Sequence, residues 1–414
     1  MDKVYDNCCG IDVHKKVLVC CLICGKKREL RQFNTTTSDI LKLVDWLSDA
    51  DCKMTAMEST ASYWKPVYNI LEASGIQAIV VNAQHMKNLP GRKTDAKDAE
   101  WIAELLQHGL LRASYIPSRD QRELREQVSY RKSLVQDKNR EINRLQKMLE
   151  GGNIKLSSVV SDINGYSARN LIMDIISGVQ ITPEHIEGMR KAKRITHQLR
   201  TNAELLVEAC NGFLSDTQKL TLKVLLNHID ELDKYIKEVD GIIDNHLNKE
   251  ELKAVEAILG VTGIGEASAK NIIAVIGTDM SRFPSADHLC SWAGLCSGNN
   301  QSAGKNRSGR TTKGNKLLRS TLIVCAHSAV KNKESFFYSR FKRIAGRRGN
   351  KKAYVAIAHS MLIAIYHILN DGEAFEDLGA GYYNQFNKER KINTYLKKLA
   401  ELGWTPGSAV PVAM

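Results

Sequence analysis

Four acidic residues in the first hundred positions have the spacing of a metal-binding cluster. Asp12 lies in an apolar segment typical of a strand, and Glu58 ends a second one. Asp95 and Asp98 are three residues apart at the start of a helical pattern, so they share a face. Strand ends and an adjoining helix can meet at one edge of a sheet, where four carboxylates repel one another unless cations lie among them.

Such a cluster predicts metal-assisted chemistry on phosphate esters. Carboxylate oxygens suit Mg²⁺ or Mn²⁺, and two such ions about 4 Å apart stabilise the attacking and leaving oxygens of phosphoryl transfer. Each residue also has a plain structural interpretation. Asp95 can cap its helix, and Asp98 can pair with Arg92. Glu58 can simply be exposed, so spacing alone leaves both interpretations open.

The distribution of charge predicts an anionic partner. The chain of 414 residues has a net charge of +13, which favours nucleic acid or a membrane surface. Between Lys305 and Lys352 there are fifteen Lys and Arg residues and one acid, Glu334, so this segment carries +14 and the remainder about −1. A solvated basic surface is the simpler interpretation. A segment this one-sided more often indicates a phosphate-binding face.

A serine flanked by small residues lies in this basic segment. Ser302, within Gln301–Lys305, can approach a phosphodiester closely. A serine hydroxyl is a poor nucleophile unless a base, a metal or a cationic pocket activates it, and a flexible loop serine is the alternative. Ser297, Ser308 and Thr312 have similar surroundings. The basic residues expected to bind nucleic-acid phosphates are Lys305, Arg307, Arg310, Lys313, Arg319, Arg347, Arg348, Lys351 and Lys352.

The segments that must position these residues predict a mixed α/β domain before Pro117. Strands first, then strands alternating with helices, are typical of this class. The expected elements are strands within residues 5–34, a helix over Thr37–Leu47, a strand over Thr55–Met57, a helix over Tyr63–Ala73, a strand over Ala78–Val81 and a helix over Asp95–His108.

Two long helices with heptad spacing are predicted next. Arg119–Glu150 contains no Gly or Pro, and its apolar residues recur every seven positions at Val128, Val135, Ile142 and Leu149. A cleaner pattern, with spacings of three and four, consists of Leu222, Leu225, Ile229, Leu232, Ile236, Val239 and Ile243. Less regular helix is expected over Gly151–Gln218. Heptads alone do not separate an intramolecular helical hairpin from a dimerisation stalk.

A third, mainly helical unit is predicted from about Ala257. The glycine-containing turn Leu259–Gly265 precedes a helix over Glu266–Ile276, as in a helix-hairpin-helix motif, whose N–H groups suit a phosphate. An ordinary glycine-rich connection fits equally well. A loop over Ser297–Gly314 and a helix over Lys316–Lys331 are expected to follow.

Cysteine usage and hydropathy predict a cytosolic protein. Ten cysteines without an N-terminal secretion signal indicate reduced thiols. Of those near the N-terminus only Cys21 and Cys24 have the spacing of zinc ligands, so we expect small core residues and no zinc. The longest apolar run, Val355–Leu369, contains two histidines and is too short to span a bilayer, so no membrane partner is expected.

Several blocks of sequence resemble the IS110-type transposases of bacterial insertion sequences. The resemblance covers nearly the whole chain, and so many matched blocks in one order argue against chance agreement. The blocks are Gly10–Lys15, Met57–Thr60, Tyr63–Pro66, Gly91–Ala99, Trp292–Leu295, Gln301–Lys305, Lys313–Asn315 and Leu318–Arg319.

The resemblance implies a RuvC-like domain of RNase H type over residues 1–117, a helical coiled-coil region over 118–250, a transposase domain over 251–372 and a tail over 373–414. It implies that Ser302 is the nucleophile. The implied partners are double-stranded DNA at the element ends and the target, a structured noncoding guide RNA encoded by the element, and further copies, as dimers that pair into tetramers. The active site then combines both domains across subunits, in the bacterial cytoplasm at the nucleoid. The implied ligands of Mg²⁺ or Mn²⁺, the DEDD set, are Asp12, Glu58, Asp95 and Asp98.

Three hypotheses for function follow. The first is a transposase or site-specific recombinase that cuts and rejoins DNA through a phosphoserine at Ser302, assisted by Mg²⁺. The second is a RuvC-like, metal-dependent junction-resolving endonuclease in which water attacks and Ser302 merely binds. The third is a non-catalytic nucleic-acid binder, which is disfavoured because four carboxylates beside phosphate weaken binding unless a metal is present.

Overall fold

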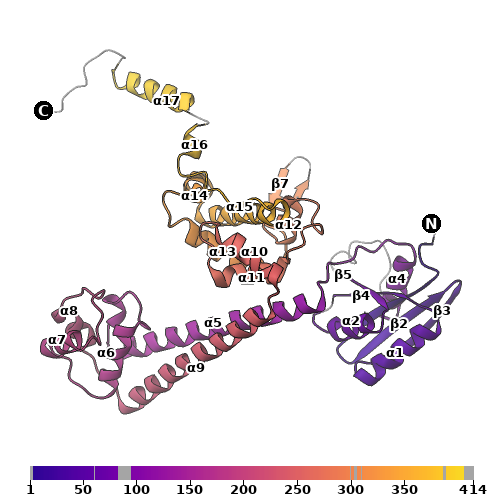
Figure 1. Ribbon diagram of the computed structural model, residues 1–414, viewed down its shortest axis with the longest axis horizontal. Helices are drawn as coiled ribbons and strands as arrows, with labels where there is room; N and C mark the ends of the chain where they lie inside the picture. Colours follow the sequence, from indigo (N-terminus) through magenta and orange to yellow (C-terminus); the bar gives the residue numbers. More distant parts are fainter. Residues whose placement is uncertain are drawn as a thin grey trace. The chain divides into compact units, whose positions relative to one another are not determined.

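The chain consists of two domains (Figure 1). The first, Met1–Ser118, is a mixed α/β domain, and the second, Arg119–Met414, is mostly helical. The computed structural model describes residues 3–59, 61–82, 95–298, 300–302, 305–308, 310–385 and 388–404. The backbone alone is described at residues 95–97, 300–302, 305–308, 384–385 and 388–391. The predicted α/β class of the first domain and the helical character of the remainder are confirmed.

The first domain is built on a five-stranded sheet with β1 at its centre. The strand order is β3-β2-β1-β4-β5. β2 is antiparallel to both β1 and β3, whereas β4 is parallel to β1 and to β5. Gly25, with a φ of 60°, begins the two-residue turn that joins β2 to β3. The strands are β1 (Asn7–Val13), β2 (Val17–Cys24), β3 (Lys27–Asn34), β4 (Met54–Glu58) and β5 (Gln77–Val81).

Helices cover both faces of this sheet. α1 (Thr37–Asp49) and α2 (Trp64–Ala73) pack on the face that carries Ile11 and Val13. α4 (Asp95–Gln107) packs on the opposite face, which carries Cys8. Because side chains alternate along a strand, the odd-numbered residues of β1 face α1 and α2, and the even-numbered residues face α4.

The second domain contains the remaining described helices and one short hairpin of strands. The helices are α5 (Arg119–Gly151), α6 (Tyr166–Ile176), α7 (Pro183–Lys191), α8 (Ala203–Cys210), α9 (Asp216–His246), α10 (Lys249–Leu259), α11 (Glu266–Ile276), α12 (Ala286–Trp292), α13 (Lys316–Ala329), α14 (Phe336–Arg348), α15 (Asn350–Asp371), α16 (Tyr382–Gln385) and α17 (Lys388–Glu401). The strands are β6 (Asn300–Ser302) and β7 (Lys305–Ser308), and one turn of 3₁₀ helix covers Leu156–Ser158. α16 and α17 lie within the segment predicted as a tail, which is therefore partly helical.

α5 and α9 form an antiparallel helical hairpin within one chain (Figure 1). The heptad row predicted on α9 is buried, except that Leu226 is buried where Leu225 is half-buried. On α5 the row of every seventh residue is only partly buried, since Val135 and Ile142 are half-buried. A straight helix drifts by about 20° per heptad against such a row, so its buried face moves to neighbouring positions. Those positions include Leu124, Leu134, Glu141 and Leu145.

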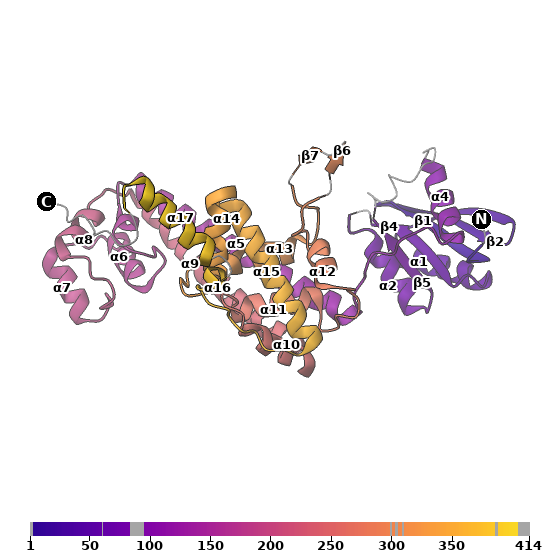
Figure 2. The ribbon, with the colours of Figure 1, turned by 90° about the horizontal axis from the view of Figure 1, so that it is seen from above.

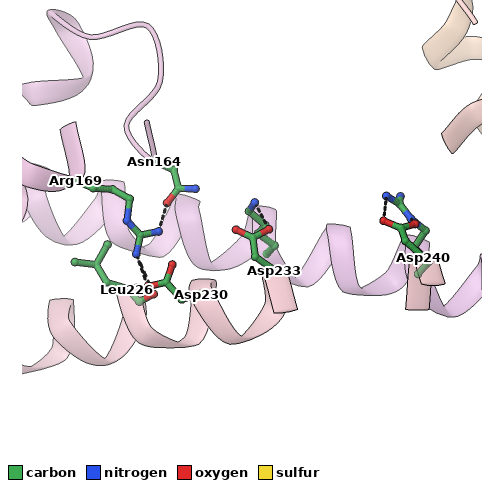
Figure 3. Close-up of polar contacts among 8 residues, drawn as sticks. Asn164, Arg169, Leu226, Asp230, Asp233 and Asp240 are labelled. Atoms are coloured by element: carbon green, nitrogen blue, oxygen red, sulfur yellow. Dashed lines mark hydrogen bonds and ion pairs between the residues drawn. The ribbon is translucent and has the colours of Figure 1, made fainter. Parts of the chain in front are cut away.

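Ion pairs fix the register of this hairpin. Arg131 of α5 pairs with Asp240 of α9, and seven residues further along Lys138 pairs with Asp233. Near the far end, Arg169 of α6 reaches Asp230 at 2.7 Å (Figure 3). α5 and α9 run in opposite directions. Seven residues after Arg131 on α5, Lys138 therefore lies opposite Asp233, which is seven residues before Asp240 on α9. The polar residues of the α5 seam thus have acidic partners.

The end of the hairpin carries a small subdomain, here called the tip subdomain (residues 155–215), which includes α6, α7 and α8 (Figure 1). Its core contains Leu171, Ile172 and Ile186 and is continuous with Leu149 of α5 and Leu222 of α9. The sequence predicted less regular helix here. Three short helices wrapped around one apolar cluster explain the irregular pattern, because each helix buries only a few side chains.

The C-terminal helices pack around α15, whose residues Ile357, Met361 and Ile365 are fully buried. With 22 residues, α15 is longer than the predicted apolar run. By length and composition alone, this helix is long and apolar enough to cross a membrane. The exclusion of a membrane span by length was therefore wrong. Its packing against α12, α13 and α14, with Lys351 and Lys352 in its first turn, is that of a core helix.

The turn between α10 and α11 is packed against its own chain. A Cβ at Gly263, where φ is 92°, would lie 2.5 Å from the backbone nitrogen of Ala329. Beside it, the Thr262 hydroxyl donates to Asp377 at 3.0 Å. One side of the predicted helix-hairpin-helix turn is thus occupied by contacts within the C-terminal helices.

Reversing one charge in the α5–α9 seam should destabilise the second domain. We expect Arg131→Asp to cost about 1 kcal/mol, because it sets two acids side by side, and Asp240→Arg in the same chain to recover part of that loss. Both side chains are partly exposed, which limits the effect. Urea denaturation followed by circular dichroism of the four-member mutant cycle measures the coupling. Lys237→Asp, on the outer face of α9, is the control, and a coupling energy of zero would contradict the assigned register.

Candidate active site

Asp12 and Glu58 lie at one edge of the central sheet, on one face of it. The parallel register of β1 and β4 pairs Ile11 with Met57, so the two acids occupy the next positions of neighbouring strands. Two residues before Asp12, Gly10 faces α4. Because alternate residues share a face, both carboxylates lie on the α4 side of the sheet.

The direction of α4 brings its first turn toward these acids. Contacts with α4 join Val4, which precedes β1, to Gln107, and within β1 they join Cys8 to Ala103 and Gly10 to Ala99. Contacts advance along the strand as they go back along the helix, so α4 runs antiparallel to β1. The helix start, with Asp95 and Asp98, is therefore directed toward the strand end that carries Asp12.

Three of the four predicted carboxylates can be placed with their side chains. Asp12, Glu58 and Asp98 are half-buried, whereas the side chain of Asp95 lies outside the described residues. Within the described ranges, no three His, Cys, Asp or Glu side chains are arranged to hold a metal ion. The donor set still fits Mg²⁺ or Mn²⁺ by its chemistry, since hard carboxylate oxygens on rigid elements are what these ions take.

His14 contacts the carboxylate of Asp12, a role that the sequence analysis did not assign. Its Nε2 lies 2.9 Å from Oδ2 of Asp12, whose side chain is only 14% exposed. The available signal was the spacing, because residues two apart at a strand end share a face. The contact orients the carboxylate of Asp12.

The N-terminal cysteines are core residues, as predicted. Cys8, Cys9, Cys20 and Cys21 are fully buried, on both faces of the sheet. Burial raises the pKa of the Cys8 and Cys21 thiols to about 11. These two thiols are therefore protonated at neutral pH.

Ser302 is the last residue of β6, in a segment that the sequence predicted to be a loop. β6 and β7 pair as an antiparallel hairpin, with Ser302 opposite Lys305. Figure 2 shows this hairpin projecting from the helices around α12 and α13. Strands of three and four residues are too short to show a period of two, which is why the loop prediction was wrong. The side chains of Ser302, Lys305 and Arg307 lie outside the described residues.

The foot of this hairpin is anchored on the helical core. Gly298 donates to the Arg310 carbonyl at 2.9 Å, and Thr312 to the Cys296 carbonyl at 3.1 Å. Below them, a Cβ at Gly314 would lie 2.2 Å from the backbone nitrogen of Gly294. Two strands of backbone thus cross at these glycines, and the crossing sets the direction in which the hairpin leaves the core.

The predicted basic residues with described side chains form two groups. Arg310 and Lys313 are exposed beside the hairpin foot, and Arg319 is half-buried on α13. The second group surrounds Gly349, between α14 and α15, and all its members are exposed: Arg347, Arg348, Lys351 and Lys352. Two lysines in the first turn of α15 oppose the helix dipole, so a bound anion would be favourable there.

Two regions of the chain match known families of transposase domains. Residues 9–154 match the DEDD transposase domain of IS110 elements, and residues 255–340 match the domain described as "Transposase IS116/IS110/IS902 family". The chain belongs to the IS110 family of transposases. It is similar to the "Insertion element IS900 uncharacterized 42 kDa protein" of Mycobacterium paratuberculosis, with 28% identity over 330 residues, which cover 72% of this chain and 79% of that protein.

Membership in the IS110 family settles the general activity. The protein is the transposase of an insertion sequence, an enzyme that cleaves and rejoins DNA. The hypothesis of a non-catalytic binder is therefore wrong. The DEDD domain also indicates that this transposase depends on a divalent metal.

Gly10→Ala should push α4 away from the sheet. The added Cβ would lie 2.3 Å from backbone atoms of Ala99 and Ala103, which move only if the helix moves. We expect a loss of about 1–3 kcal/mol in stability and a loss of DNA cleavage, because Asp98 moves with α4. Thermal melting and a cleavage assay measure the two effects.

Gly151→Ala is the matched control for this substitution. Gly151 ends α5, and a Cβ there would have no heavy atom within 4 Å. We expect this variant to melt as the wild type does. If Gly10→Ala melted and cleaved like Gly151→Ala, the close packing of α4 on β1 would be wrong.

Proposed function

We propose that this IS110 transposase cuts DNA by direct attack of the Ser302 hydroxyl on the scissile phosphate. In this proposal Ser302, from the second domain of the same or a neighbouring copy, lies beside the carboxylates of the first domain during catalysis. The observation that carries the proposal is the placement of Asp12 and Glu58 on one edge and one face of the sheet, with the first turn of α4 directed toward them.

The chemical steps balance without an external energy source. Ser302 loses its proton and its oxygen bonds to phosphorus, while the bond from phosphorus to the 3′ oxygen breaks and that oxygen takes up a proton. The products are a 5′-phosphoserine and a free 3′-hydroxyl. Rejoining is the reverse reaction with a different 3′-hydroxyl, and the phosphoester bond is conserved throughout.

The DEDD acids are the proposed ligands of the metal. Mg²⁺ or Mn²⁺ bound by Asp12, Glu58, Asp95 and Asp98 would polarise the phosphate and stabilise the leaving oxygen. His14 holds one oxygen of Asp12 in place. The four acids belong to regular elements, with Asp12 on β1, Glu58 on β4, and Asp95 and Asp98 at the start of α4. This location favours the proposed role, because side chains on strands and helices are held more rigidly than those on loops.

The hairpin supports a role for Ser302 as nucleophile. Ser302 is the last residue of β6. The foot of the β6–β7 hairpin is held by backbone hydrogen bonds and by the close contact of Gly294 with Gly314. An attacking hydroxyl needs a defined position, and a short braced hairpin gives a better-defined position than a free loop. Exposed cations near the foot, Arg310 and Lys313, can neutralise the flanking phosphates.

We further propose the partners that such a reaction requires. The transposase acts on double-stranded DNA at the element ends and the target, as a homodimer that assembles into a tetramer. A structured noncoding RNA encoded by the element supplies sequence specificity. The reaction takes place in the bacterial cytoplasm, at the nucleoid. The basic surface over residues 305–352 supports binding to nucleic acids but does not separate RNA from DNA.

A covalent adduct is the expected intermediate. We expect the wild-type protein, with Mg²⁺, guide RNA and an element-end duplex nicked beside the cut site, to retain the 3′-labelled fragment, whose 5′ phosphate is bonded to the serine, after denaturing electrophoresis. Ser302→Ala should form no adduct, and Asp12→Asn or EDTA should lower the yield by about a hundredfold or more. Ser308→Ala, on β7, is the matched control and should form the adduct.

The same assay separates the serine mechanism from the water mechanism. Cleavage by the wild type without an adduct, or an adduct formed by Ser302→Ala, would contradict the serine mechanism. Cleavage that persists in Ser302→Ala but disappears in Asp12→Asn would indicate the junction-resolving endonuclease instead.

The exposed cations around Gly349 should contribute to the salt dependence of binding. We expect replacement of Arg347, Arg348, Lys351 and Lys352 by Gln to lower the slope of log K against log salt by up to about 0.9 per lost contact with duplex DNA. Fluorescence anisotropy over a salt series measures this slope. The control replaces four exposed lysines of α9 and α10, which are Lys223, Lys234, Lys237 and Lys249. Equal slopes in the two variants would mean that the Gly349 group faces solvent in the complex.

A further inference from the structure

The tip subdomain carries a basic hollow that the transposase activity does not explain. This subdomain lies outside both regions matched by the family comparisons, which end at residue 154 and resume at residue 255. From Arg190 to Arg200 the chain has five Lys and Arg residues and no acid. The segment forms the last turn of α7 and the loop that follows it.

Part of this charge is neutralised within the subdomain, and part is not. Arg194 pairs with Asp174 at 2.6 Å, and Arg190 pairs with Glu187 at 2.8 Å. Lys193 and Arg200 are exposed and form no ion pair in the part of the chain that the structure describes. Two cations are therefore available to an external anion.

These two cations line a surface hollow of about 810 Å³. Three of its seven lining residues are Arg190, Lys193 and Arg200, a fourth is His197, and none is acidic. Several basic side chains in the lining of one hollow, without an acid, favour a phosphate-bearing ligand.

Lys193 occupies a backbone conformation that favours glycine. It follows the C-terminal cap of α7 with a φ of 58°. Glycine or asparagine is the usual residue at this position, and a lysine there carries a conformational cost. The cost is understandable if the side chain has a function, and the position directs Lys193 into the lining of the hollow.

The wall of the hollow is held in place by hydrogen bonds to α6. The Thr196 backbone donates to the Ser167 hydroxyl at 3.0 Å, and Asn170 donates to the Arg194 carbonyl at 2.8 Å. Ile195, between them, is buried in the core. The loop is therefore a formed surface, which lowers the entropic cost of binding a ligand.

A second hollow, of about 270 Å³, adjoins the first and shares Thr196 and Leu199 with it. Its lining includes Tyr166, which is 62% exposed, and the amide side chain of Gln198. An exposed aromatic ring next to a basic hollow is the combination of groups that binds a nucleotide chain, where stacking on aromatic rings accompanies phosphate contacts.

We propose that the tip subdomain binds an unpaired stretch of nucleic acid, with phosphates in the basic hollow and a base stacked on Tyr166. A duplex hides its base faces, so the aromatic hollow favours an unpaired strand over a double helix. The shared chemistry is the nucleotide chain, from RNA or from DNA. Binding at the tip does not require cleavage, so it is separate from the serine mechanism.

Site-directed crosslinking on the full-length protein tests this binding site. Twelve-nucleotide strands with 4-thiouridine in RNA, or 4-thiothymidine in DNA, are irradiated with the protein, and adducts are mapped by mass spectrometry. We expect adducts on peptides from residues 155–215, and a preference for one strand type identifies the source. Lys193→Gly with Arg200→Gln, or Tyr166→Leu, should lower these adducts by about tenfold. Adducts confined to other parts of the chain would overturn the proposal.

Two controls distinguish a loss of binding at the tip subdomain from a loss of stability or of net charge. Lys193→Gly removes a charge and relieves the positive φ, so the variant should melt no lower than the wild type. Lys234→Gln with Lys237→Gln, on the outer face of α9, removes two exposed charges and should leave the tip adducts unchanged. An equal loss in this variant would mean that only net charge matters. A twelve-base-pair duplex that competes as well as the unpaired strand would overturn the role of Tyr166.

Discussion

The close contact between α4 and the central strand determines where the carboxylates proposed to bind the metal lie. At Gly10 the strand has no side chain, so the helix backbone at Ala99 and Ala103 approaches the sheet directly. Strand alternation then places Asp12 on the helix side, and the helix direction brings Asp98 toward the same edge. A larger residue at this one position would separate acids that lie far apart in the sequence.

The sequence carried enough information to predict the first domain well. Apolar runs and turn residues located the strands and helices, because each element there buries one regular face. Alternation along β1 also separated Asp12 from Ile11 and Val13. The contact of His14 with Asp12 was not predicted, since it depends on how the chain leaves the strand end. The side chain of Asp95, a member of the same set, is outside the described residues.

Prediction was weaker in the second domain, where packing decides more than local pattern. The heptads of α9 were clear, but they did not reveal that α9 packs on α5 of the same chain, where Asp233 and Asp240 meet Lys138 and Arg131. The β6–β7 hairpin was missed because its strands are too short to show alternation. The tip subdomain was seen only as irregular helix. Its charge and its hollows arise from a loop folded back onto α6, which no spacing along the chain reveals.

The two ends of the tip subdomain meet at a single point. The backbone of Phe213 donates to the carbonyl of Gly152 at 2.9 Å, and a Cβ at Gly212 would lie 2.3 Å from the same oxygen. The 59 residues between Gly152 and Gly212 therefore begin and end at one contact between these two backbone segments. A tight turn at this junction would therefore join the end of α5 to the start of α9 directly, so the helical hairpin can close without the tip subdomain.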